Sequence, residues 1–136
     1  MSKSSLTSKT FGTVNTNTLN VDKISYTDKM SVTQLTSLTS GVTLHSPVGA
    51  ITTVSSDLTS SGSLSFTCTN STVDASKYVM ANIINYSGST GYPSIIIDDV
   101  TSGSFLVNVR NNSTSAILNG TIKIAFLVLW KLTLIF

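Results

Sequence analysis

Charge is scarce in this chain of 136 residues. Only 10% of the residues are charged, against roughly 25% in an average soluble domain. Every acidic residue is Asp and none is Glu, and because Glu favours helices whereas Asp favours turns, this bias argues against helices. The eight Lys and Arg residues are scattered without a basic run, so the sequence predicts no nucleic-acid-binding stripe.

Reactive side chains are as few as charged ones. Cys68 is the only cysteine, which excludes an intrachain disulfide and a cysteine-based metal cluster. It shares one face of an alternating segment with Leu64 and Phe66, so we expect it to be a small buried apolar side chain.

The chain also lacks the residue arrangements that enzymes use. His45 is the only histidine, and no Gly-x-Ser-x-Gly elbow accompanies it. Asp98 and Asp99 are adjacent, so on a strand they point to opposite faces and do not form the facing pair of a glycosidase; we expect them to end a strand and start a turn. No phosphate-binding loop, zinc-ligand spacing or dinucleotide fingerprint occurs. The sequence therefore predicts a protein that is not an enzyme and has no cofactor or metal.

Long hydrophobic runs are missing too. The longest uninterrupted one, Ile124 to Trp130, lies between Lys123 and Lys131 and is far shorter than the roughly 20 residues of a spanning helix. The sequence predicts no membrane span. The segment 122–130 is apolar on both faces for much of its length, so we expect a central strand that is covered on both sides, followed by a short apolar tail.

What the chain does have is period-two alternation of apolar and polar residues. Eight short segments with this pattern are separated by clusters of Gly, Asn, Asp and Ser, which are typical of turns. This spacing predicts an all-β fold, a single antiparallel β-sandwich similar to a jelly roll, in residues 31–136. The expected strands are 31–37, 41–46, 49–55, 63–70, 77–87, 93–100, 105–110 and 122–130.

Residues 1–30 differ from the rest, because they are polar and have too little apolar surface to fold alone. We expect an extended N-terminal arm. It is either disordered or becomes ordered by lying along another subunit, and the weak alternation in "TLNVDKISY" favours the second reading. The arm's expected contacts with a subunit or capsid are its apolar residues Phe11, Val14, Leu19, Val21, Ile24 and Tyr26.

Two further patterns bear on carbohydrates. Tyr86 and Tyr92 flank the "SGSTG" turn and form the best candidate pair for stacking on a sugar, although core or interface packing is the commoner use of such aromatics. Asn-x-Ser/Thr triplets arise easily in a chain so rich in these residues and mainly mark loops. They begin at Asn70, Asn85, Asn111, Asn112 and Asn119.

Four segments of the chain carry a family resemblance. "SVTQLTSLTSGVTLHSPVGAITT", "LSFTCTNSTVDASKYVMANI", "VTSGSFLVNVRNNS" and "IKIAFLVLW" resemble the small β-sandwich module of phage tail-fibre, head-fibre and capsid-decoration proteins and of related structural proteins of large DNA viruses. The resemblance covers residues 31–130, and its most specific piece is the opening, Val32 to Thr52.

This resemblance implies a non-enzymatic protein of the virion, a minor capsid or decoration protein that forms a homotrimer and contacts other capsid proteins. The chain has a short arm where long fibre proteins have a shaft, which favours a free-standing capsid protein over a fibre tip. A host-recognition fibre head or a carbohydrate-binding module, with a host-surface glycan as partner, is the alternative.

Overall fold

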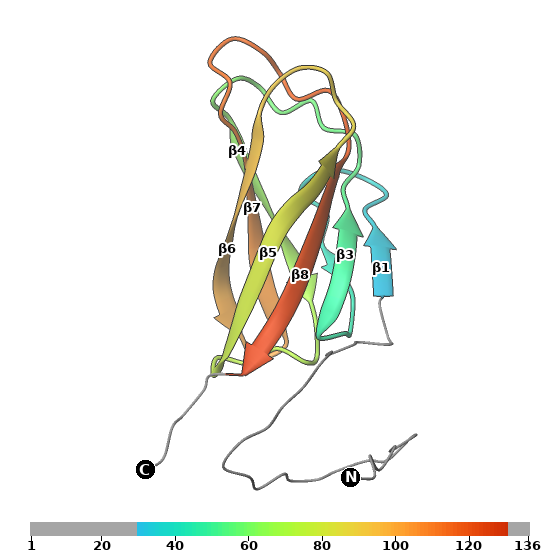
Figure 1. Ribbon diagram of the computed structural model, residues 1–136, viewed down its shortest axis with the longest axis vertical. Helices are drawn as coiled ribbons and strands as arrows, with labels where there is room; N and C mark the ends of the chain where they lie inside the picture. The colour runs from blue at the N-terminus through green and yellow to red at the C-terminus, as the bar shows by residue number, and fades with distance from the viewer. Residues whose placement is uncertain (1–29, 131–136) are drawn as a thin grey trace, which may run out of the picture.

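The computed structural model describes residues 30–130 of the chain. These residues form eight strands and no helix, and the strands stack as two four-stranded sheets (Figure 1). The predicted β-sandwich is confirmed. The strands are β1 (Met30–Thr33), β2 (Val42–Thr43), β3 (Val48–Thr52), β4 (Ser63–Thr69), β5 (Lys77–Tyr86), β6 (Pro93–Thr101), β7 (Ser104–Asn111) and β8 (Ile122–Trp130).

The chain crosses from one sheet to the other at almost every connection. Sheet A has the strand order β1-β3-β8-β5 and sheet B the order β2-β4-β7-β6. Only β6 and β7 are joined as a hairpin within one sheet, through a turn at Gly103, whose φ of 86° suits glycine. β8 is an interior strand of its sheet, as its sequence predicts.

The antiparallel prediction holds for four strand pairs and fails for two. β3 with β8, β5 with β8, β4 with β7 and β6 with β7 are antiparallel, whereas β1 with β3 and β2 with β4 are parallel. The parallel pairs arise because each pair is separated in sequence by one strand of the opposite sheet. Two crossings restore the original direction of the chain.

The core lies between the sheets and consists of alternate, inward-facing residues of the strands together with buried loop residues such as Leu58 and Leu118. Phe105 of β7 meets Phe126 of β8 edge to face, with ring centroids 5.4 Å apart. Cys68 is fully buried in this core, as expected, and burial raises the pKa of its thiol to about 12. The thiol therefore stays protonated and unreactive at neutral pH.

Several expected strands end differently from their prediction. β2 ends at Thr43 and β3 at Thr52, each three residues before the predicted end. β1 stops at Thr33 because Gln34 turns inward, where its side chain amide donates to the carbonyl oxygens of Leu38 and Ser40 at 3.0 and 2.6 Å. β6 does not end at the Asp98 and Asp99 pair but continues to Thr101 through an irregular register, with Asp99 at a φ of 44°.

Several predictions fall partly or wholly outside the described residues. The tail after Trp130 lies there, as do all the expected contact residues of the arm, which are Phe11, Val14, Leu19, Val21, Ile24 and Tyr26. Within residues 30–130, no helix is long and apolar enough to cross a membrane.

Candidate functional site

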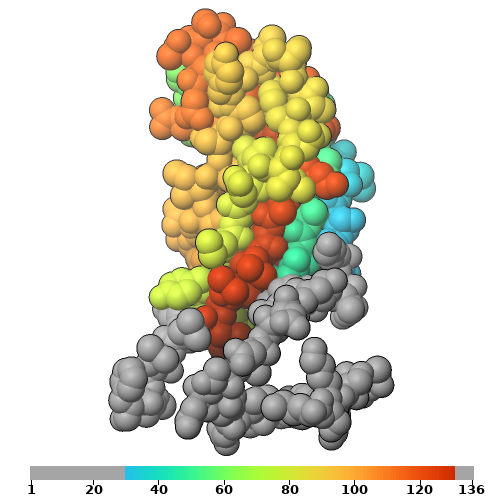
Figure 2. All heavy atoms as spheres, in the orientation of Figure 1, coloured from blue at the N-terminus to red at the C-terminus, as the bar shows by residue number. Residues whose placement is uncertain are grey.

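The outward side of sheet A is largely apolar along β3, β5 and β8, with Thr52, Asn82 and Lys123 among its polar exceptions, and nothing in residues 30–130 covers it. Figure 2 shows β5, β8 and β3 side by side on the face toward the viewer. Met80 is 60% exposed, Tyr78 and Ile84 are also largely exposed, and Leu127 and Leu129 are half-buried. We call this surface the apolar face of sheet A; it consists of Val48, Ala50, Tyr78, Met80, Ile84, Ala125, Leu127 and Leu129.

Charge is nearly absent from this face. The four strands of sheet A contain two lysines and no carboxylate. Lys77 already has partners within the chain. Its ammonium donates to the carbonyl oxygen of Thr72 at 2.6 Å and lies 4.1 Å from the centre of the Trp130 ring. Lys123 is the other lysine, and it lines a shallow hollow between β3 and the end of β5. Such a face suits a neutral, apolar partner.

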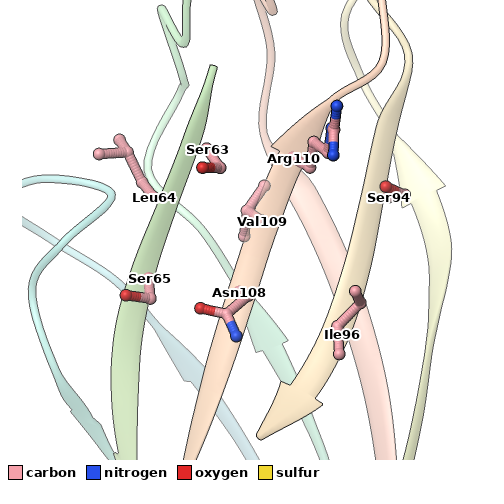
Figure 3. A pocket seen from close by; sticks show the side chains of 8 residues that line it. All are labelled: Ser63, Leu64, Ser65, Ser94, Ile96, Asn108, Val109 and Arg110. Atoms are coloured by element: carbon pink, nitrogen blue, oxygen red, sulfur yellow. The ribbon is translucent and has the colours of Figure 1, made fainter. Parts of the chain in front are cut away.

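Sheet B presents a different outer surface, a shallow groove of about 280 Å³ across its three longest strands, lined by polar and apolar side chains. Figure 3 shows the groove side chains, with Arg110 and Asn108 on the middle strand β7. Short hydroxyl side chains flank them on β4 and β6. The lining residues are Ser63, Leu64, Ser65, Ser94, Ile96, Asn108, Val109 and Arg110.

The two tyrosines of the sugar-stacking hypothesis have different environments. Tyr86 packs against the core, and its hydroxyl donates to Thr90 O at 2.6 Å and accepts from Asn119 N at 2.9 Å. Tyr92 is 72% exposed beside a small loop pocket that also includes Ser89 and Ser115. Tyr86 therefore holds the loop in place, and Tyr92 is the one of the two with a free ring face.

The remaining candidates for chemistry stand apart from one another. His45 is exposed, and its Nδ1 accepts a hydrogen bond from the backbone N–H of Ser71 at 3.0 Å. Asp98 and Asp99 are exposed on β6. No group of three or more His, Cys, Asp or Glu residues that suits a metal ion occurs within the described part of the chain.

Two asparagines that sequence analysis took only as loop markers organise the sandwich ends. Asn70 and Asn111 are fully buried. The Asn70 amide donates to Ser46 O at 2.7 Å. The Asn111 amide donates to the carbonyls of Leu58, Thr59 and Ala116, and its Oδ1 accepts from the backbone N–H of Tyr92 and Ser113. Their position at strand ends was the only sequence signal for this role.

Comparison with protein-family models, with curated proteins and with solved structures finds no match to this chain.

Proposed function

We propose that this chain is a non-enzymatic structural protein of a virus particle, a minor capsid or decoration protein that assembles as a homotrimer on the particle surface. The observation that carries the proposal is the apolar face of sheet A. The sequence of β8 predicts a strand covered on both sides, yet residues 30–130 cover only one side. A second copy of the chain supplies the missing cover.

The size of the face supports contact between copies. β3, β5 and β8, which carry the face, have 5, 10 and 9 residues. At about 3.3 Å per residue and about 4.8 Å between strands they cover roughly 400 Å², about half of the roughly 800 Å² that each partner contributes to a specific interface. The face therefore supplies the centre of such a contact, and neighbouring residues supply the rest.

The chemistry of the face supports a like partner. An apolar patch without carboxylates offers no complementarity to a charged protein or nucleic acid. The chain itself is poor in charge over its whole length, so its own surface is a suitable neighbour. The choice of three copies comes from the resemblance to trimeric virion modules in residues 31–130.

Light scattering on the full chain tests this proposal. We expect one species with the mass of three chains at micromolar concentration, unchanged by salt because the contact is apolar. A monodisperse monomer over the same concentration range would contradict the homotrimer and leave the apolar face without its proposed partner.

A second candidate function, glycan binding by a fibre head or carbohydrate-binding module, is favoured by the exposure of Tyr92. An exposed aromatic ring beside hydroxyl groups is a suitable platform for a sugar. On a glycan array we expect the signal of an uncharged sugar to disappear in Tyr92→Ala and to persist in Tyr78→Ala, which removes an exposed tyrosine from the other sheet. A blank array, or equal loss in both variants, counts against this function.

A further inference from the structure

Arg110 is a cation without a counter-charge in the part of the chain that the structure describes. It is exposed on the middle strand of sheet B. The one ion pair within residues 30–130 joins Lys77 to Asp74. The residues in register with Arg110 on either side are Ser63 and Ser94. Their short side chains leave the guanidinium uncovered, so its donors are available to a ligand.

The groove around Arg110 offers hydrogen bonds of both kinds. Ser94 is oriented by Asn112, whose amide nitrogen donates to the Ser94 hydroxyl at 2.8 Å, which leaves the hydroxyl proton of Ser94 for another acceptor. Asn108 is two residues before Arg110 on β7, and it is in register with Ser65 of β4 and Ile96 of β6. The Ile96 side chain is 67% exposed and adds an apolar wall to the groove.

The backbone cannot be the recognition element here. β7 is paired with β4 on one side and β6 on the other, so its N–H and C=O groups are already used. A ligand on this surface contacts side chains only. It must match one guanidinium, three hydroxyls, one amide and one aliphatic wall, in about 280 Å³, a volume below the usual range for drug-sized ligands.

We propose that this groove binds a single carboxylate-bearing sugar, with the carboxylate on Arg110. A carboxylate accepts two parallel hydrogen bonds from a guanidinium. The ring hydroxyls of the same sugar match the Ser63, Ser65 and Ser94 hydroxyls and the Asn108 amide, and its C–H face packs on Ile96. This site goes beyond the proposed structural role and does not depend on it.

Saturation-transfer NMR on the full chain tests the site, with N-acetylneuraminic acid and glucuronic acid as probes and their carboxyl methyl esters as uncharged matches. We expect both acids to bind with a dissociation constant of about 1 mM, as befits a shallow, solvent-exposed site. Each ester should bind at least tenfold more weakly. Arg110→Gln should weaken acid binding at least tenfold, and Lys123→Gln, which removes an exposed cation from the other sheet, should leave it unchanged.

Three outcomes would overturn the proposal. Esters that bind as well as the acids would remove the role of the carboxylate, and acetate that binds as tightly as the acids would reduce the site to a bare anion contact. Loss of binding in Tyr92→Ala together with normal binding in Arg110→Gln would move the sugar to the loop pocket. These measurements report ligand binding by the full chain and its single-residue variants, so their outcome is independent of the mass of the chain in solution.

Discussion

Replacing Asn111 with alanine is expected to lower the free energy of unfolding by about 3 kcal/mol, because it leaves several buried polar groups without partners. The amide nitrogen of Asn111 donates to the carbonyls of Leu58, Thr59 and Ala116 at 3.1, 3.1 and 2.8 Å. Alanine removes the donor. The carbonyls of Leu58 and Thr59 still accept from the backbone N–H groups of Leu118 and Gly62. Among the described residues it is the Ala116 carbonyl, beside the fully buried Asn111 position, that loses its partner.

The same side chain also orders the loops near Tyr92. Asn111 Oδ1 accepts from Tyr92 N at 3.2 Å and from Ser113 N at 3.0 Å, so one amide joins three separate stretches of the chain. We therefore expect Asn111→Asp to be destabilising as well, since a carboxylate accepts these two bonds but cannot donate to the three carbonyls.

Asn112 provides a matched control for this prediction. It is the next residue, it is exposed, and its amide donates to Tyr92 O and to Ser94 Oγ at the surface. Asn112→Ala should change the free energy of unfolding by less than about 1 kcal/mol. Urea unfolding followed by circular dichroism measures both variants. Equal effects in the two would show that Asn111 does not organise the sandwich end.

The second large effect concerns assembly. Leu127→Asp is expected to convert the proposed trimer to a folded monomer, raising the dissociation constant by about a thousandfold, equivalent to about 4 kcal/mol. Leu127 lies at the middle of the apolar face of sheet A and is only half-buried in one subunit. The single subunit therefore tolerates a charge there. A closed contact between copies does not, because it buries carboxylates that have no partner.

Thr67→Asp is the control for Leu127→Asp. Thr67 is exposed on β4, in the outer surface of the opposite sheet, so the same charge is added outside the proposed contact. Light scattering should give three chain masses for Thr67→Asp and one for Leu127→Asp, with circular dichroism unchanged in both. A folded Leu127→Asp trimer would place the contact between copies elsewhere on the chain.

The strand positions were predictable because they depend on local pattern. Alternation places residues such as Phe105 and Val107 on one face, and both are buried in the structure. The ends of β1 and β6 were misjudged because of a side-chain hydrogen bond and a backbone conformation. β1 stops at Thr33 because the Gln34 side chain bonds to carbonyls in the following loop, and β6 passes Asp99 by adopting a positive φ. Neither the Gln34 hydrogen bonds nor the positive φ of Asp99 changes the alternation of apolar and polar residues in the sequence.

The candidate surfaces were less predictable, since exposure depends on which segments meet. Tyr86 and Tyr92 look equivalent in the sequence, but only the first has Asn119 of a distant loop bonded to its hydroxyl. In the sequence, Arg110 is one of eight scattered basic residues. Its groove exists because β4 and β6 place Ser63 and Ser94 on either side of it, a register that no local pattern specifies.

The sequence by itself determined the all-β class, the approximate strands and the buried Cys68, because alternation and turn residues act over a few neighbouring positions. It also determined that β8 is apolar on both faces. Only the tertiary structure decided the strand order, the two parallel edge pairs and which side of β8 remains open. These depend on contacts between residues far apart in the chain, where loop connections and side-chain packing choose among several arrangements that one hydrophobic pattern allows.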